Sequence, residues 1–377
     1  MFFKPKIDGM EIIMKKILAA LLLLVTLTSL FACGTKYKPV KSTKEESKVV
    51  MTVSAGGKSY DVRYELYRAF FLNNRDQVDG GDRSVWSGAD AEKYISRINN
   101  LIADDVATIY STLHFAESLG IDPYSKKFEE SITEYVRIGV EGNGEVTGHG
   151  GDYEAYLASL KEMNLNYSVS VLLIRYQLAL EAINEYYSGR VDEVLGNLGS
   201  EYEVKAEDVR SYYFGEECAR VLHLFYQEGV KSDLELENAR AAIAGADSDL
   251  SVALYIINNS MGLESELIKD KKVTGSIVGK YALDSDYYSD YAEAAFSLSV
   301  GETSDVIRVK GENPGAYVIY KLDKTEEHFN DNYSVIRSSY IDNLVGKRLS
   351  EIKRDMTGSV SYTAKYDEIN HSSVSMD

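Results

Sequence analysis

The change of hydrophobic periodicity near residue 204 constrains the fold of this 377-residue chain more than any other sequence feature. N-terminal to it, apolar residues recur three and four positions apart over long stretches, which is the period of amphipathic helices. C-terminal to it, short helical stretches alternate with strand-like runs. We therefore expect an α+β fold with a helical region, a compact α+β domain around a small antiparallel sheet, and a terminal helix.

The long helices are predicted from apolar residues at three- and four-residue spacings. These residues are Leu66, Phe70 and Phe71; Ile98, Leu101, Ile102, Ile109, Leu113, Ala116 and Leu119; Phe128, Ile132, Tyr135 and Val136; and Leu172, Tyr176, Ala179, Leu180 and Ile183. Residues 139–151 hold six glycines, and no lysine follows them in the pattern of a phosphate-binding loop. We expect a flexible loop there.

The N-terminus has the features of a secretion signal. Lys15 and Lys16 precede an apolar run of about 15 residues, which is too short to span a bilayer. Residues 30–33 (Leu-Phe-Ala-Cys) resemble the bacterial lipobox, whose cysteine is lipidated after cleavage. We predict a signal peptide over 1–32, with Met14 a better start than Met1, and a lipid-anchored tether over 33–48 that begins at Cys33. The alternative is an ordinary cleaved signal with an incidental cysteine.

Charge and composition exclude several classes of site. The 59 acidic residues outnumber the 41 basic ones and give a net charge of −18, so nothing replaces the counterions of a nucleic acid and no such partner is expected. If Cys33 is lipidated, Cys218 has no partner within the chain and is expected to be a buried thiol. The histidines fall in no metal-ligand spacing, so we expect no metal and no other cofactor. They are His114, His149, His223, His328 and His371.

Four segments together resemble the extracytoplasmic foldases of the PrsA and SurA type, which join a helical chaperone region to a parvulin-type peptidyl-prolyl isomerase domain. Residues 50–60 look like the family's opening strand, turn and helix start. Residues 220–225 (Arg-Val-Leu-His-Leu-Phe) are similar to its Arg-x-x-His strand, and residues 294–302 resemble its Ala-Ala-Phe-x-Leu-x-x-Gly-Glu helix. Residues 317–322 (Tyr-Val-Ile-Tyr-Lys-Leu) resemble its closing strand, Tyr-His-Ile-Ile-Lys-Val.

The resemblance implies a set of site residues. His223 falls on the first active-site histidine, whereas Val318 replaces the second. Phe296, Tyr287 and Tyr291 would line the pocket for the proline ring. Isomerisation requires an apolar slot and polar groups that favour the twisted amide, and it requires no nucleophile. The replaced histidine therefore leaves open whether the chain is an isomerase.

The resemblance also implies a division of the chain and a function. We expect a helical chaperone region over 49–215, a parvulin-like domain over 216–325, a C-terminal helix over 326–360 that packs on the chaperone region, and a polar tail over 361–377. The implied function is a chaperone or foldase with weak isomerase activity, held on the outer face of a bacterial cytoplasmic membrane. Its partners would be unfolded or partly folded exported polypeptides.

Two alternatives stay open at this point. The first is a fully active peptidyl-prolyl isomerase on the same scaffold. The second is a solute-binding lipoprotein. Such receptors usually need two lobes of repeated strand–helix units, and the helix-first order of this chain argues against that arrangement.

Overall fold

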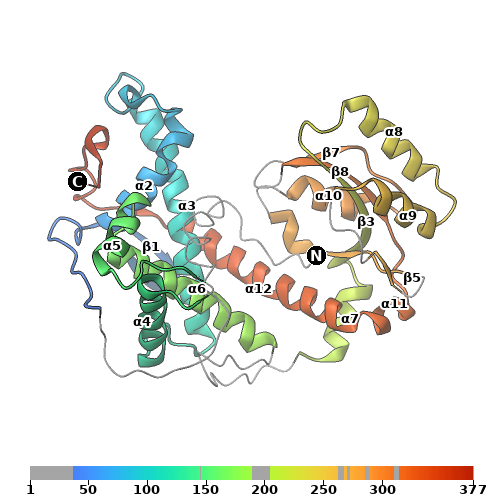
Figure 1. The fold of residues 1–377 in the computed structure, drawn as a ribbon, viewed down its shortest axis with the longest axis horizontal. Coiled ribbons are helices and arrows are strands. Elements are labelled where there is room, and N and C mark those ends of the chain that lie inside the picture. The colour runs from blue at the N-terminus through green and yellow to red at the C-terminus, as the bar shows by residue number, and fades with distance from the viewer. Residues whose placement is uncertain are drawn as a thin grey trace. The chain divides into compact units, whose positions relative to one another are not determined.

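The computed structural model describes residues 37–144, 146–188, 204–261, 267–269, 272–284, 288–309 and 314–376 (Figure 1). The predicted signal peptide, Cys33 and Tyr287 lie outside these residues. The chain divides into two compact units, which we call the helical unit (37–188 and 348–376) and the sheet unit (204–347). Helices and small antiparallel sheets form them, which confirms the predicted α+β class. Within the described residues, no helix combines the length and apolar character that crossing a membrane requires.

The helical unit is built around α3, whose buried residues recur at helical spacing from Ile98 to Ala116. This stripe packs against α2 and α6. The elements of the unit are β1 (Val49–Ala55), β2 (Lys58–Arg63), α2 (Tyr64–Asp79), η1 (Arg83–Trp86), α3 (Ala91–Ser118), α4 (Lys126–Glu141), α5 (Tyr153–Glu162), α6 (Tyr167–Ser188), the C-terminal part of α12 (Tyr333–Gly358), β9 (Ser361–Tyr362) and η4 (His371–Ser373).

Both ends of the helical unit meet in one three-stranded sheet of order β2-β1-β9. Gly56 and Gly57, with φ of +56° and +79°, form the tight turn between β1 and β2. On the other side of β1, Met51 pairs with Tyr362 of β9. Beyond β9, the imidazole of His371 lies 3.0 Å from the Tyr67 hydroxyl. The predicted polar tail therefore contributes a strand and a buried contact, because its few anchoring side chains reach α2.

Helix α5 is absent from the sequence prediction. Asp152 caps it by accepting a hydrogen bond from the Ala155 amide at 3.0 Å. Only two of its side chains, Tyr156 and Leu160, are buried. A ten-residue helix with two buried positions has too little periodicity to be recognised.

The sheet unit contains a four-stranded antiparallel sheet of order β6-β3-β8-β7 and a two-stranded ribbon, β4-β5. Its central strands, β3 and β8, pair from Val221 with Lys321 to Gln227 with Gly315. Its elements are α7 (Ala206–Phe214), β3 (Cys218–Gln227), α8 (Asp233–Ala244), α9 (Asp249–Asn259), β4 (Ile268–Lys269), β5 (Lys272–Val273), β6 (Ser276–Gly279), η3 (Lys280–Asp284), α10 (Ser289–Ser297), β7 (Ile307–Val309), β8 (Gly315–Lys321), α11 (Glu326–Asp331) and the first part of α12.

Helices cover both faces of the four-stranded sheet, as Figure 1 shows. On one face Leu222 and Leu224 of β3 form a core with α8 and α9. On the other face Ala219 and Val221 pack with Ala292 and Ala295 of α10. Because successive strand residues point to opposite faces, the apolar residues of β3 are divided between these two cores.

Helix α12 belongs to both units, whereas the sequence predicts that residues 326–360 pack on the helical region. Within the sheet unit, the Tyr340 ring lies 5.5 Å from that of Tyr212. Within the helical unit, the ammonium of Lys353 lies 2.7 Å from a carboxylate oxygen of Asp104. Residues 326–347 therefore pack within the sheet unit, and residues 348–358 pack within the helical unit.

Candidate functional site

His223 lies in the middle of β3, on the face of the sheet that α10 covers. Its cross-strand neighbour is Ile319, which belongs to the core on that face. Phe225, two residues further along β3, packs against the same core. The residues of β3 between and beside them face α8 and α9 instead, because side chains alternate along a strand. His223 itself is intermediate in exposure.

Four aromatic rings gather at this position, and we call them the aromatic cluster (His223, Phe225, Tyr291, Tyr317). The centroid of the His223 ring lies 5.7 Å from those of Tyr291 and Tyr317, and the Phe225 ring lies 4.8 Å from that of Tyr317. The Tyr291 and Tyr317 rings meet edge to face at 5.3 Å. Such edge-to-face contacts are favourable because the positive edge of one ring meets the negative face of the next.

The protonation of His223 follows from its surroundings. The Tyr291 hydroxyl lies 2.9 Å from Nδ1 of His223. Burial lowers the pKa of His223 to about 4, so the imidazole is neutral near pH 7. When Tyr291 donates to Nδ1, the ring proton resides on Nε2, which makes Nε2 a hydrogen-bond donor. The cluster thus combines apolar ring surfaces with one neutral donor.

The structure brings His223 and Tyr291 together. Phe296, on α10, packs against the core that contains Tyr291 and Tyr317. The Phe296 ring centroid lies 5.6 Å from the ammonium of Lys321. Val318 lies on the opposite face, in the core with α8 and α9. Tyr287 is outside the described residues.

Two members of the cluster were missed in the sequence analysis. Phe225 could have been found, because it is two positions from His223 on a strand and must share its face. Tyr317 could be assigned only from the register between β3 and β8, in which it lies opposite Phe225. A one-residue shift of that register would have turned Val318 toward the histidine instead.

Arg220 fixes the strand that carries His223. Its guanidinium, in a side chain only 6 % exposed, donates from Nε to the Thr274 carbonyl at 2.9 Å and from one terminal nitrogen to the Asp323 carbonyl at 2.7 Å. The other terminal nitrogen donates to the Val273 carbonyl. Arg220 therefore ties β3 to the segment between β5 and β6 and to the end of β8. This is a positioning role.

A cavity of about 590 Å³ lies beside Arg220, away from the aromatic cluster. Its lining includes Lys272, Glu327 and His328, and these groups are bonded to protein partners. Lys272 lies 2.7 Å from a carboxylate oxygen of Glu327, and Nδ1 of His328 lies 2.8 Å from the Tyr213 hydroxyl. The polar groups of the cavity thus hold the fold of the unit together.

Other predicted chemistry is located as follows. Cys218 is buried, as the sequence predicts, and burial raises the pKa of its thiol to about 12. A thiol with that pKa is protonated near pH 7 and is a poor nucleophile. Across the described residues, no three His, Cys, Asp or Glu side chains form a group that could hold a metal ion.

Comparison with known proteins gives structural neighbours only. No family model matches the chain, and no curated protein matches it. The foldase protein PrsA of Streptococcus pneumoniae aligns at a TM-score of 0.27 with 14% identity, over 81% of this chain and 92% of its own. The peptidylprolyl isomerase PrsA of Bacillus anthracis aligns at a TM-score of 0.27 with 16% identity, over 68% of this chain and 95% of its own. PrsA of Bacillus subtilis aligns at a TM-score of 0.25 with 14% identity, over 83% of this chain and 93% of its own. TM-scores of this size establish neither a family nor a function for the chain.

Proposed function

We propose that this protein is an extracytoplasmic chaperone or foldase that binds unfolded exported polypeptides. The observation that carries the proposal is a group of exposed apolar side chains in and beside α8 and α9, which we call the apolar surface: Val230, Leu234, Leu250, Leu254 and Met261, each between 41% and 72% exposed. Contiguous exposed apolar groups mark interaction sites in soluble proteins, and Leu250 and Leu254 are exposed neighbours one helical turn apart on α9. Flexible Leu and Met side chains can repack against many different sequences, which suits unfolded clients.

The geometry of α9 supports this use of the surface. Val252, Ala253 and Ile256 are buried against the sheet, so that face of the helix stabilises the fold. Leu250 and Leu254 are four residues apart and share the outer side of the helix. These two leucines therefore do not contribute to the core of the unit, and an extended apolar segment of a client could cover them.

The location belongs to the same proposal. The lipobox-like residues 30–33 and the preceding apolar run support export and lipidation of Cys33. Lipid anchoring would hold the chain on the outer face of the cytoplasmic membrane, where exported polypeptides emerge unfolded. The sequence resemblance to PrsA- and SurA-type foldases supports the same clients.

The aromatic cluster favours weak isomerase activity as an accompanying function. Tyr291 and Tyr317 are buried, whereas His223 and Phe225 are partly exposed, so contact with a proline ring would be made at His223 and Phe225. Because Val318 faces away, no second histidine assists His223. We therefore expect slow catalysis with His223 as the catalytic residue and Tyr291 as its positioning residue.

Replacing Leu250 and Leu254 together with serine is expected to weaken client binding roughly thirtyfold, because each of these half-exposed leucines would lose about 1 kcal/mol of apolar burial against the client. Binding is measured by the fluorescence anisotropy of a labelled, reduced and unfolded secreted protein. Suppression of its aggregation is followed by light scattering. Val335→Ser is the matched control, because Val335 is also partly exposed but lies on α12.

Two results would overturn the chaperone proposal. One is a wild-type chain that neither binds the unfolded protein nor suppresses its aggregation. The other is a loss of binding in the Val335→Ser control equal to that in the double-leucine variant, which would show that binding does not depend on the apolar surface. Circular dichroism spectra that match the wild type would show that both variants remain folded.

A protease-coupled assay on a prolyl peptide is expected to show a wild-type rate slightly above the uncatalysed rate. His223→Ala should return the rate to the uncatalysed level. Tyr291→Phe keeps the ring but removes the bond to Nδ1, and it should lower the rate because the tautomer of His223 is no longer fixed. Equal rates for the wild type and His223→Ala would remove the isomerase activity and leave the chaperone proposal intact.

A further inference from the structure

Residues 37–48, which the sequence predicts to be a flexible tether, are attached along the helical unit, and we call them the N-terminal strap. Near its C-terminal end, the carbonyls of Glu46 and Lys48 accept hydrogen bonds from the amides of Glu65 and Tyr64, at 3.1 and 2.8 Å. These bonds hold the strap against the start of α2. The side chains described next hold its remaining length.

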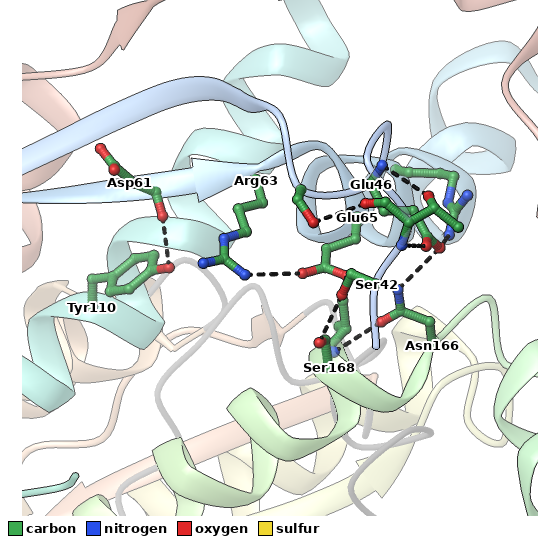
Figure 2. Close-up of polar contacts among 12 residues, drawn as sticks. Ser42, Glu46, Asp61, Arg63, Glu65, Tyr110, Asn166 and Ser168 are labelled. Atoms are coloured by element: carbon green, nitrogen blue, oxygen red, sulfur yellow. Dashed lines mark hydrogen bonds and ion pairs between the residues drawn. The ribbon is translucent and has the colours of Figure 1, made fainter. Parts of the chain in front are cut away.

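Ser42 lies at the centre of a polar network between two helices (Figure 2). Its hydroxyl donates to a carboxylate oxygen of Glu65 at 2.5 Å and lies 2.9 Å from the Ser168 hydroxyl. Asn166 donates to the same oxygen of Glu65 at 2.8 Å. Because Glu65 begins α2 and Ser168 lies in the first turn of α6, Ser42 joins the starts of both helices. The Glu65 carboxylate is buried and uses these donors.

Glu46 adds an ion pair to the strap. Its carboxylate accepts from Arg68 at 2.7 Å and from Asn166 at 3.1 Å. Burial alone would raise the pKa of Glu46, but hydrogen bonds from the Thr43 amide, Arg68 and Asn166 outweigh it and lower the pKa to about 2. Arg68 is 8% exposed with the strap in place, and detachment of the strap would remove this partner. The ion pair therefore favours the attached state.

The strap is held as far as the first described residue. The Tyr37 hydroxyl donates to Glu141 at 2.8 Å, and the Tyr37 ring lies 5.2 Å from that of Tyr153. The Tyr153 hydroxyl donates to the Lys38 carbonyl at 2.8 Å. Tyr37 is therefore fixed to both α4 and α5.

We propose that the face of the helical unit formed by Tyr37, Lys38 and Tyr153 lies against the lipid headgroups of the membrane; this rests on the proposed lipid anchor at Cys33. Tyr37 is four residues from Cys33, and four residues reach at most about 14 Å. A free tether up to Val49 would span 16 residues and reach about 55 Å. Tyrosine rings favour the membrane–water interface, and the exposed Lys38 suits anionic headgroups.

The test measures how close chosen positions are to the bilayer. Full-length lipidated protein carries a nitroxide on a cysteine introduced as Glu154→Cys, beside Tyr153, or as Ala89→Cys. Ala89 follows the far end of α2, whose 16 residues span about 24 Å from the strap. Buried Cys218 stays unlabelled. In vesicles of phosphatidylglycerol and phosphatidylcholine with nickel-chelating headgroups, we expect a relaxation enhancement several-fold larger at 154 than at 89.

A strap-release variant supplies the decisive comparison. Tyr37→Ser combined with Ser42→Ala and Glu46→Gln removes the side-chain contacts of the strap and should reduce the enhancement at 154 to that at 89, whereas Lys44→Gln, at an exposed strap position, should leave it unchanged. Equal enhancement at both positions in vesicle-bound wild type would overturn the membrane-facing surface and leave the lipid anchor standing. Failure of the wild type to co-float with vesicles would overturn both the anchor and this inference. Neither result bears on client binding by the apolar surface.

Discussion

Replacing Arg220 with leucine is expected to lower the free energy of unfolding of the sheet unit by about 3–5 kcal/mol. Leucine fills part of the volume of the arginine stem but donates no hydrogen bond. The carbonyls of Val273, Thr274 and Asp323 would each lose the donor that the guanidinium supplies. An unsatisfied buried polar group costs about 1–3 kcal/mol, so three such losses account for an effect of this size.

The matched control is Arg210→Leu. Arg210 is exposed and forms an ion pair with Glu326, and surface pairs of this kind contribute little. Unfolding in urea is followed by hydrogen exchange of the β3 amides, because the single tryptophan, Trp86, reports only on the helical unit. If Arg220→Leu unfolds at the same urea concentration as Arg210→Leu, Arg220 does not hold the sheet together as described.

Lowering the pH from 6.5 to 5 is expected to destabilise the sheet unit through His223 and His328. Nδ1 of each ring lies within 2.9 Å of a tyrosine hydroxyl, and burial lowers each pKa from 6.5 to about 4. As the pH falls, these two histidines are therefore protonated in the unfolded chain at a higher pH than in the folded chain. The stability that these groups give is complete above pH 6.5 and is lost as the pH falls toward 4, at about 3 kcal/mol for each histidine.

Asp342 opposes this effect in the same pH range. Burial raises its pKa to about 7, so the folded state carries a proton there that the unfolded state lacks. Unfolding of the wild-type sheet unit between pH 6.5 and 5 should thus take up about one proton, two at the histidines less one at the aspartate. Asp342→Asn should raise this uptake to about two protons. The double variant Asp342→Asn with His328→Gln should return it to about one proton.

The measurement is the slope of the unfolding free energy against pH, from urea titrations followed by hydrogen exchange of β3. Surface carboxylates do not disturb it, because they titrate below this range. A slope in Asp342→Asn that stays at the wild-type value would contradict the assignment of Asp342. A flat profile in that variant would contradict the role of the buried histidines.

The sequence predicts the parts of the fold in which one face is buried over many residues. Helices α3 and α6 run for 28 and 22 residues, so their apolar spacing repeats often enough to be recognised. Strands β3 and β8 were recognised from short apolar runs and from the family resemblance. Their hydrogen-bonded register required the structure, and so did the membership of Tyr317 in the aromatic cluster.

The parts that the sequence did not predict are held by isolated contacts between distant residues. The strap has no apolar period, and Ser42 reaches Ser168 across 126 positions through hydroxyl groups. Tyrosine–histidine pairs are equally invisible in the sequence. His114 and His371 in the helical unit bond to Tyr60 and Tyr67, as His223 and His328 bond to tyrosines in the sheet unit. Four of the tyrosines in this tyrosine-rich chain thus have a structural role as hydrogen-bond partners of histidines.

The position of β1 between β2 and β9 sets the order in which the chain can fold during synthesis. Met51 pairs with Tyr362, so the sheet of the helical unit cannot close until β9 has been made. Within the described residues the sheet unit is one continuous segment that precedes β9. Once folded, it shortens the flexible loop that β9 must close, which lowers the entropy lost on pairing. Synthesis from the N-terminus would therefore complete the sheet unit first and the helical unit last.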